Sequence, residues 1–169
     1  QKIDSPKRNK KYPKFLSLDQ SKQLLSAVDG KNKERDYAII TLFLNCGLRV
    51  SELAGINLSD IDSEMTTLYV TGKGSKQRIL YLNDACRDAL KSYLKVRPGN
   101  AKSKDADALF ISRNHNRMSV KTVQYMIYQR LKQSDLGNLH MSVHKLRHTA
   151  ATLMYKYGKT DVRVLKDIL

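Results

Sequence analysis

Residues 34–46 restrict the fold of this chain more than any other segment. They are rich in apolar side chains, namely Tyr37, Ala38, Ile39, Ile40, Leu42, Phe43 and Leu44. A helix with so many apolar residues has to be largely buried, so other elements must pack around it. Gly47 follows, and glycine is the residue that most often ends a helix in the left-handed conformation. The sequence therefore predicts a buried helix that stops at Gly47.

Most of the remaining chain is also predicted to be helical. Capping residues open six further helices. These helices run from Ser17 to about Val28, from Ser51 to about Gly55, from Asn83 to about Arg97, from Ser119 to about Leu131, from Ser142 to Gly158, and from Thr160 to Leu169. Gln20, three residues after Ser17, adds a capping box. The last helix is still apolar at its final residue, so we expect the chain to be cut there.

A hairpin interrupts the helices. Residues 67–70 and 78–82 are short β-rich runs on either side of the glycine-containing loop 72–76. Residues 109–111 are predicted to add a third short strand. The predicted fold is therefore mainly α with a small antiparallel β-sheet, an α+β arrangement.

The chain carries a large positive charge on a body whose composition indicates a folded core. Lysine and arginine number 31 and aspartate and glutamate 16, for a net charge of +15, while 41% of the residues are hydrophobic. Residues 1–14 hold six of the cations and one carboxylate, and Pro6 and Pro13 disfavour helix there. This arm is either a solvated linker or a segment that contacts phosphates. A basic domain favours a polyanion as its partner, with nucleic acid first.

Several classes of protein are disfavoured. No apolar run approaches the roughly 18–20 residues that span a bilayer, and the N-terminus has no apolar core of a signal peptide. Cys46 and Cys86 form neither a metal-ligand pattern nor a disulfide framework, which suits a reducing cytoplasm. We therefore expect no membrane segment, no structural zinc and a cytoplasmic location.

Arg49 lies between the predicted end of one helix and the cap of the next. A loop position of this kind can direct a side chain into a cleft. Glu52, three residues later, can hold the guanidinium in an ion pair. The alternative interpretation is an ordinary arginine–glutamate pair on the surface of a helix.

Residues 72–78 read Gly-Lys-Gly-Ser-Lys-Gln-Arg. The glycines allow the backbone to approach a ligand closely, but the spacing is not that of a Walker loop. A hairpin tip inserted into a DNA groove would place Lys73 at the tip, with Lys76 and Arg78 on phosphates. An ordinary basic hairpin is the alternative.

His144, Arg147 and His148 share one face near the start of a predicted helix. Two histidines four residues apart also occur in zinc sites, but Lys145 replaces the glutamate of that motif, and a cation repels a metal. Arginine and histidine beside a helix N-terminus suit a phosphate instead, because they combine charge-assisted hydrogen bonds with a protonatable donor.

Taken in order, these motifs resemble the catalytic core of the tyrosine recombinases, the phage integrase family, and above all its Xer-type members. The matching segments are Gly-Leu-Arg-Val-Ser-Glu-Leu at 47–53, the loop at 72–78, and His-Lys-Leu-Arg-His-Thr at 144–149. Residues 12–17 resemble the beginning of that family's catalytic domain after an interdomain linker. The resemblance covers residues 12–169 and implies the fold of the recombinase catalytic core.

The resemblance also implies a role for each matched residue. Arg49 and Arg147 would clamp the scissile phosphate. Lys73 would protonate the leaving 5′-hydroxyl, and His144 would donate to the phosphate and shuttle protons. The residues implied to support this site or to contact DNA are Glu52 and His148 as supporting groups, and Lys76, Arg78, Arg117 and Lys121 on DNA.

In this family a tyrosine attacks the phosphodiester and forms a 3′-phosphotyrosyl link, and no metal, cofactor or nucleotide is consumed. The resemblance places that tyrosine beyond Leu169, since Tyr155 and Tyr157 are expected on the core-packing side of their helix. It implies that residues 1–14 are a linker arm and that 15–169 are a truncated catalytic domain without the family's N-terminal domain. The implied partners are double-stranded DNA and other recombinase protomers, as a tetramer on DNA, in the nucleoid of a bacterium or archaeon.

Two other functions fit the charge alone. One is a non-enzymatic basic module that only binds DNA phosphates, and the other is an RNA-binding protein. Readers of single-stranded RNA expose stacking aromatic residues, whereas this chain is 7% aromatic and has no such motif. The residues that must converge on one phosphate-sized site in an enzyme are Arg49, Lys73, His144 and Arg147.

Overall fold

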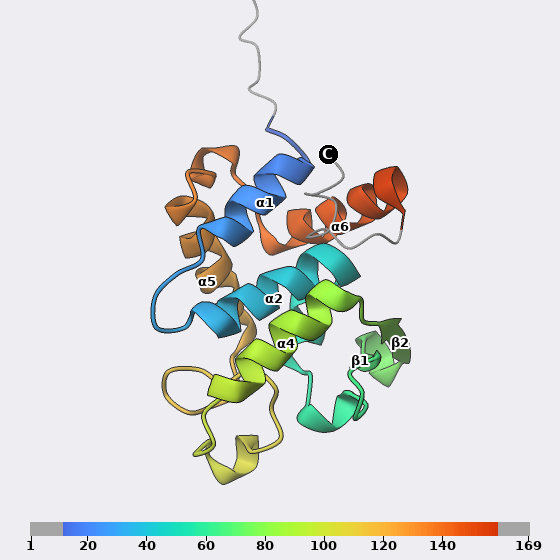
Figure 1. Ribbon diagram of the computed structural model, residues 1–169, viewed down its shortest axis with the longest axis vertical. Helices are drawn as coiled ribbons and strands as arrows, with labels where there is room; N and C mark the ends of the chain where they lie inside the picture. The colour runs from blue at the N-terminus through green and yellow to red at the C-terminus, as the bar shows by residue number, and fades with distance from the viewer. Residues whose placement is uncertain (1–11, 159–169) are drawn as a thin grey trace, which may run out of the picture.

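A computed structural model describes residues 12–158. This part of the chain contains six α-helices and one β-hairpin (Figure 1). The helices are α1 (Leu18–Ser26), α2 (Lys33–Cys46), α3 (Val50–Ala54), α4 (Asp84–Val96), α5 (Val120–Gln133) and α6 (Val143–Tyr157), and the strands are β1 (Thr67–Thr71) and β2 (Gln77–Tyr81). Short 3₁₀ turns lie at Leu58–Asp60, Lys73–Ser75, Ser103–Asp105 and Gly137–Leu139. The predicted fold class, mainly α with a small antiparallel sheet, is confirmed.

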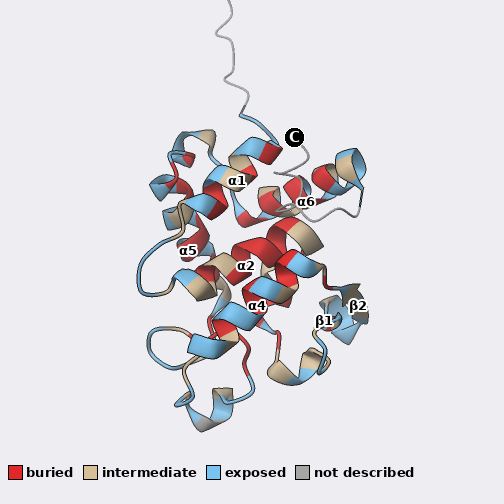
Figure 2. Ribbon diagram, viewed as in Figure 1, coloured by how far each residue is buried: buried red, intermediate tan, exposed pale blue. Residues whose placement is uncertain are grey.

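The helix α2 is the buried helix that the sequence predicts. Every residue from Ala38 to Leu44 is buried, and α4 and α6 pack against it (Figures 1 and 2). Gly47 ends the helix in the left-handed conformation at φ 66°, and its N–H donates to the carbonyl oxygen of Phe43 at 3.1 Å. Only glycine adopts this conformation without strain, so the predicted stop is confirmed.

Four other helices begin at their predicted caps. Ser17 and Gln20 form the predicted capping box on α1. The side chains of Asn83, Ser119 and Ser142 each accept a hydrogen bond from the backbone N–H three residues later, at the start of α4, α5 and α6. Each of these contacts satisfies an amide that would otherwise have no partner in the first turn.

The helix α3 begins earlier than predicted. Ser51 was expected to cap it, but Ser51 is its second residue and Arg49 holds the cap position. The reason is Glu52, whose carboxylate turns back and accepts the backbone N–H of Arg49 at 2.8 Å. A glutamate at the third helical position commonly stabilises a helix start in this way.

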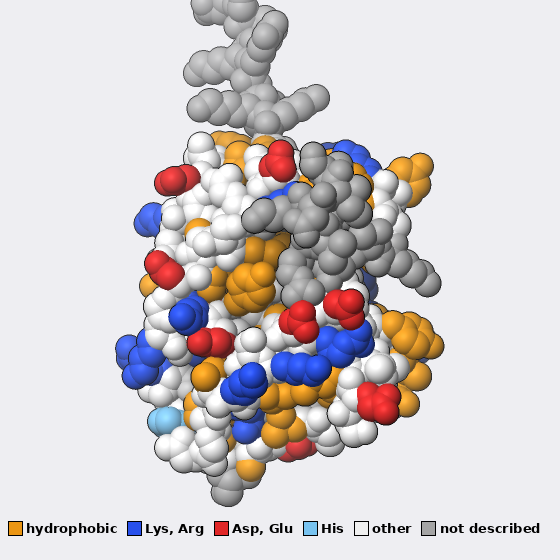
Figure 3. Space-filling model, viewed as in Figure 1, with side chains coloured by type: hydrophobic (Ala, Val, Ile, Leu, Met, Phe, Trp, Pro, Cys, Tyr) orange, Lys and Arg blue, Asp and Glu red, His pale blue; other side chains and the backbone are white. Residues whose placement is uncertain are grey.

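The hairpin lies at the predicted position, around the glycine-containing loop 72–76, and its strands are antiparallel. Thr67 lies opposite Tyr81 and Thr71 opposite Gln77. Leu68 and Val70 on β1 are buried, while the outer face exposes Tyr69, Ile79 and Tyr81. Figure 3 shows hydrophobic side chains at the edge of the molecule where Figure 1 draws the hairpin. The hairpin is therefore attached to the domain by one face only.

Residues 109–111 do not form the predicted third strand. Their backbone bonds to Ile56 and Met118 on separate loops instead of to β1 or β2. The hydroxyl of Tyr93 in α4 donates to the first carbonyl of the segment at 2.9 Å and accepts from its last amide at 3.1 Å. A buried side chain thus provides the hydrogen bonds that a neighbouring strand would have provided.

Two predictions fall outside the described residues, namely the helix at 160–169 and most of the arm at 1–14.

Between residues 12 and 158, none of the helices combines the length and the apolar character needed to cross a bilayer. Cys46 and Cys86 are free thiols whose sulfur atoms lie 3.9 Å apart.

Replacement of Tyr93 by phenylalanine should destabilise the fold. We expect the free energy of unfolding to fall by about 1–3 kcal/mol, because a buried amide at residue 111 loses its acceptor. Urea denaturation followed by circular dichroism measures the change. Tyr125→Phe, at a tyrosine that is mostly exposed, is the matched control. Equal stabilities of Tyr93→Phe and the unmodified chain would contradict the assignment.

The same variant should alter the response to alkaline pH. Burial raises the pKa of the Tyr93 hydroxyl above its ordinary value. Because the unfolded chain then releases this proton at a lower pH than the folded chain, the contribution to stability is present below about pH 10 and is lost as the pH rises through the folded-state pKa. Tyr93→Phe should therefore lose less stability than the unmodified chain above about pH 10.

Candidate active site

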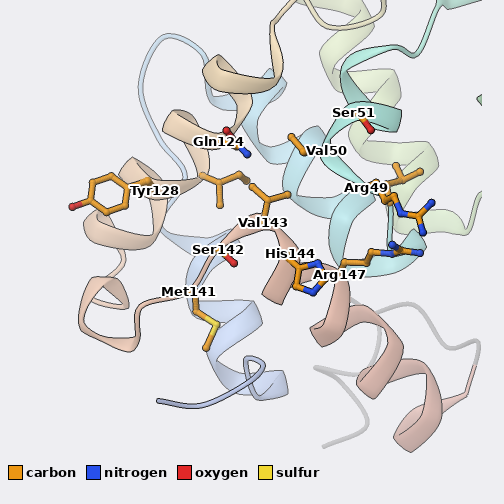
Figure 4. Close-up of a pocket in the computed structure, with 12 residues that line it drawn as sticks. Arg49, Val50, Ser51, Gln124, Tyr128, Met141, Ser142, Val143, His144 and Arg147 are labelled. Atoms are coloured by element: carbon orange, nitrogen blue, oxygen red, sulfur yellow. The ribbon is translucent and has the colours of Figure 1, made fainter. Parts of the chain in front are cut away.

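Two arginines and a histidine line one pocket of about 630 Å³. Arg49 precedes α3, and His144 and Arg147 lie in α6, while Gln124 and Tyr128 of α5 form another wall. Figure 4 shows the two guanidinium groups next to each other, with the imidazole of His144 beside them. The sequence predicts that four residues converge on one phosphate-sized site, and the structure brings three of them together in this pocket.

The turn at Gly47 places Arg49 beside α6. A Cβ atom at Gly47 would lie 3.6 Å from the Cβ of Ala150 and 3.9 Å from the carbonyl oxygen of Arg147. The end of α2 therefore packs against the turn of α6 that carries Arg147. Leu48 is fully buried, and the next residue, Arg49, is extended and exposed.

The helix α6 presents His144 and Arg147 to the pocket because its opposite side belongs to the core. Its buried residues include Val143, Leu146 and Ala150. The positive end of the α6 dipole also lies near this pocket, since His144 is the second residue of the helix. Both features favour an anion at this place.

Within residues 12–158, neither of the two arginines has a carboxylate partner. Among the ion pairs and hydrogen bonds of residues 12–158, none involves the guanidinium group of Arg49 or of Arg147. Two adjacent guanidinium groups repel each other, so an anion between them removes a penalty as well as adding attraction. Arginine binds phosphate oxygens through two parallel hydrogen bonds. The arrangement is therefore complementary to a phosphate.

Lys73 lies on the other side of Arg49. A second pocket, of about 460 Å³, is lined by Arg49, Ser51, Glu52, Thr71, Gly72 and Lys73. Arg49 belongs to both pockets, and the exposed Lys73 begins the short turn between β1 and β2. The other three predicted residues therefore lie around Arg49, with His144 and Arg147 in the same pocket and Lys73 in the adjoining one.

The sequence predicts that Glu52 binds the guanidinium of Arg49, but the structure shows other partners for this carboxylate. Its side chain is buried, and it forms an ion pair with Arg78, with Nη1 to Oε2 at 2.5 Å and Nη2 to Oε1 at 3.2 Å. The predicted pair of Glu52 with Arg49 is therefore wrong. The contact that exists at Arg49 is with its backbone N–H. The guanidinium of Arg78 is thus bound within the protein, and its contact with DNA stays a prediction.

Arg117 also has partners within the protein, and its contact with DNA stays a prediction. Its Nη1 donates to the carbonyl oxygens of Ala54 and Ile56, both at 3.0 Å, and its Nη2 donates to the side chain of Asn57. These bonds hold the loop after α3 against the segment before α5. The other two residues expected on DNA, Lys76 and Lys121, are exposed.

His148 does not line the pocket. Its exposed ring stacks on Phe15, with centroids 5.9 Å apart and planes 5° apart. One residue further along α6, the hydroxyl of Thr149 accepts the N–H of Leu16 at 2.9 Å. The structure thus shows His148 in contact with the segment before α1. The family resemblance implied a different place for it, beside the phosphate as a supporting group.

Two tyrosine predictions have different outcomes. Tyr157 packs against Leu18 and Leu153, as expected, whereas Tyr155 is 92% exposed and does not face the core. Tyr155 lies in the last turn of α6, on a side that the described residues 12–158 leave uncovered. Among the described residues, no three His, Cys, Asp or Glu side chains gather as metal ligands.

The sequence did not single out Gln124 and Tyr128, although both line the main pocket. Their spacing of four residues places them on one face of α5, opposite the apolar residues that define its buried face. Helical periodicity could have assigned them to a common exposed face. Nothing in the local sequence shows that this face borders α6.

Residues 14–169 match the phage integrase family. This chain belongs to that family. It is 56% identical over 169 residues to the tyrosine recombinase XerC of Caldanaerobacter subterraneus subsp. tengcongensis, covering 100% of this chain and 47% of that protein. It is 40% identical over 173 residues to the tyrosine recombinase XerC of Alcanivorax borkumensis, covering 99% of this chain and 55% of that protein. The integrase-family chain thus spans about half the length of the curated relatives it matches.

Solved structures show the same fold. The crystal structure of XerA recombinase matches this integrase-family chain with a TM-score of 0.76 and 32% identity, covering 94% of this chain and 56% of that one. XerH site-specific recombinase bound to its difH substrate, in a pre-cleavage complex, matches with a TM-score of 0.71 and 23% identity, covering 86% of this chain and 44% of that one. The recognition of the recombinase catalytic core from the sequence is confirmed.

Removal of the Arg117 guanidinium should weaken the fold. We expect Arg117→Ala to lower the free energy of unfolding by about 1.5–3 kcal/mol, because carbonyl oxygens of Ala54 and Ile56 lose a charged donor. Arg117→Lys should recover only part of this loss, since one ammonium cannot reach all three acceptors. Urea denaturation measures both values, with Lys121→Ala on the exposed face of α5 as the control. An unchanged midpoint for Arg117→Ala would show that these bonds contribute nothing.

Proposed function

We propose that this chain activates a DNA phosphodiester within a tyrosine recombinase, which breaks and rejoins strands through a 3′-phosphotyrosyl intermediate. The observation that carries the proposal is the pair of guanidinium groups, Arg49 and Arg147, which line one pocket and have no ion-pair partner among residues 12–158. The family membership supports the same reaction.

The two arginines stabilise the charge of the transition state. As a nucleophile attacks phosphorus, negative charge grows on the non-bridging oxygens. Arg49 and Arg147 are held in place by the end of α2 and by α6 before the substrate binds, so they need little reorganisation. His144, at the same pocket, donates a hydrogen bond to the phosphate and takes part in proton transfer.

Lys73 protonates the leaving oxygen. Cleavage breaks the bond between phosphorus and the 5′-oxygen, and that oxygen needs a proton to leave as a hydroxyl. The lysine begins a glycine-containing turn beside Arg49, where a hairpin can approach a bound phosphate. The attacking tyrosine oxygen, in this proposal, comes from outside these 169 residues, and the new phosphorus–oxygen bond preserves the energy of the phosphodiester.

The proposed partners follow from the same site. Double-stranded DNA is the substrate, at a recombination site of a chromosome or a mobile element. Other protomers join on that DNA as a tetramer, in the bacterial or archaeal nucleoid. Residues 15–169 belong to the catalytic domain, and residues 1–14 form the basic linker to an N-terminal domain. The DNA complex of XerH, with the same fold, supports DNA as the substrate.

Positive charge elsewhere supports binding but does not define the site. Figure 3 shows lysine and arginine side chains in a row with carboxylates along the region where Figure 1 draws α4. The residues of that helix include Arg87, Lys91 and Lys95 together with Asp84 and Asp88. A module that only bound DNA would need such charge alone. The enzyme needs the unpaired arginines beside a general acid.

Loss of either arginine should slow cleavage strongly without unfolding the domain. In a full-length protein that contains this chain, we expect Arg49→Ala or Arg147→Ala to slow strand cleavage by about 10²–10³-fold. The rate of covalent protein–DNA adduct formation on a nicked suicide duplex measures the effect. Arg113→Ala, at an exposed loop position, is the control. Unchanged cleavage rates with weaker DNA affinity would favour the non-enzymatic module.

The two hairpin lysines should behave differently. Lys73→Ala should slow cleavage by about 10²–10⁴-fold, because the leaving oxygen loses its proton donor. Lys76→Ala should weaken DNA binding and reduce the slope of affinity against salt concentration. A substrate with a bridging 5′-phosphorothiolate should restore cleavage by Lys73→Ala, since sulfur leaves without a proton. A Lys73→Ala protein that stays slow on this substrate would be a phosphate ligand and not an acid.

A further inference from the structure

Glu52 occupies a position that connects the two halves of the proposed site. Its side chain is 1% exposed, so its charge requires a partner inside the protein. One carboxylate receives the backbone N–H of Arg49 and both terminal nitrogens of Arg78. Arg49 belongs to the clamp, and Arg78 lies on the strand that follows the Lys73 turn. The carboxylate therefore joins the arginine side of the site to the lysine side.

Arg78 reaches Glu52 from the inner face of the hairpin. It lies opposite Val70, which is buried, and it is itself half-buried. The two hydrogen bonds form the parallel geometry in which arginine and carboxylate pair most strongly. Tyr69 and Ile79 on the outer face of the hairpin are partly exposed, so the inner face, where this ion pair lies, attaches the hairpin to the domain.

The turn that carries Lys73 lies directly on this carboxylate. The N–H of Gly72 donates to the carbonyl oxygen of Lys76 at 2.7 Å and closes the turn. A Cβ atom at Gly72 would lie only 3.4 Å from Oε2 of Glu52. The contact between Glu52 and Gly72 thus fixes the backbone position from which the side chain of the next residue, Lys73, extends.

We propose that Arg78 is a positioning residue for Lys73, and that it acts through the buried carboxylate of Glu52. This inference rests on the proposed function of Lys73 as general acid. The ion pair keeps the hairpin at a constant distance from Arg49, so the ammonium group meets the leaving oxygen of the phosphate that Arg49 holds. A displacement of about 1 Å at such a contact can reduce a rate by about 10²-fold.

The alternative is that Arg78 contacts a DNA phosphate. A phosphate contact and a positioning role differ in what they affect. The first contributes to affinity and to its salt dependence. The second contributes to protonation of the leaving group and leaves affinity nearly unchanged, because Glu52 already neutralises the guanidinium.

The test compares two substrates on one preparation of each full-length variant. The substrates are a suicide duplex with the natural 5′-oxygen and the same duplex with a bridging 5′-phosphorothiolate. We expect Arg78→Ala to cleave the natural duplex about 10²-fold more slowly and the phosphorothiolate duplex at close to the unmodified rate. The ratio of the two rates does not depend on the fraction of folded protein, so partial unfolding does not imitate the result.

Two further variants complete the design. Arg78→Lys keeps the charge but cannot bond both carboxylate oxygens at once, so it should show the same rescue with a smaller defect. If Arg78→Ala does not fold, Arg78→Lys still allows the cleavage rates on the two duplexes to be compared. Arg113→Ala removes an exposed arginine on the loop before α5, and it should cleave both duplexes at the unmodified rates.

The outcomes separate this inference from the proposed function. If Lys73→Ala is not rescued by the phosphorothiolate, the general-acid assignment fails. If Lys73→Ala is rescued while Arg78→Ala and Arg78→Lys remain equally slow on both duplexes, Lys73 is the acid and Arg78 does not position it. If the Arg78 variants cleave normally once bound and only lose affinity and salt slope, Arg78 is a phosphate contact, and the inference is overturned.

Discussion

The burial of α2 determines where the groups of the site lie. Because the residues from Ala38 to Leu44 are buried, α2 is flanked by α4 and α6, and its end at Gly47 meets the turn of α6 that bears Arg147. Arg49 follows two residues later. The site is therefore assembled at one end of the buried helix, from segments that are far apart in the sequence and that meet only when this core forms.

The net charge of the chain overstates the number of cations that face a substrate. Asp36 is buried and binds Arg35 at 3.0 Å and Arg130 at 2.8 Å, and Glu52 binds Arg78. A buried carboxylate without such a partner would be strongly destabilising, so these arginines serve the fold. What distinguishes the arginines of the site is the lack of a carboxylate partner among residues 12–158, and charge counting does not reveal that.

Local chemistry made much of the structure predictable. Residues close in sequence determine the capping box at Ser17, the stop at Gly47 and the position of the hairpin, and these features were predicted correctly. The third strand at 109–111 was not, because the hydroxyl of Tyr93 replaces a strand neighbour. The partners of Arg78 and Arg117 were missed for a similar reason: an arginine on a strand or loop shows its acceptor only after the tertiary structure forms.

The actual contacts of Glu52 explain why its carboxylate does not occupy the guanidinium of Arg49. The spacing of three residues suggested that Glu52 would bind the guanidinium of Arg49. At the third position of a helix, however, a glutamate turns back toward the cap and accepts its backbone N–H. The remaining lone pairs are then taken by Arg78, which neutralises the carboxylate. Glu52 therefore holds the backbone of Arg49 and does not occupy its guanidinium, which the proposed function assigns to the phosphate.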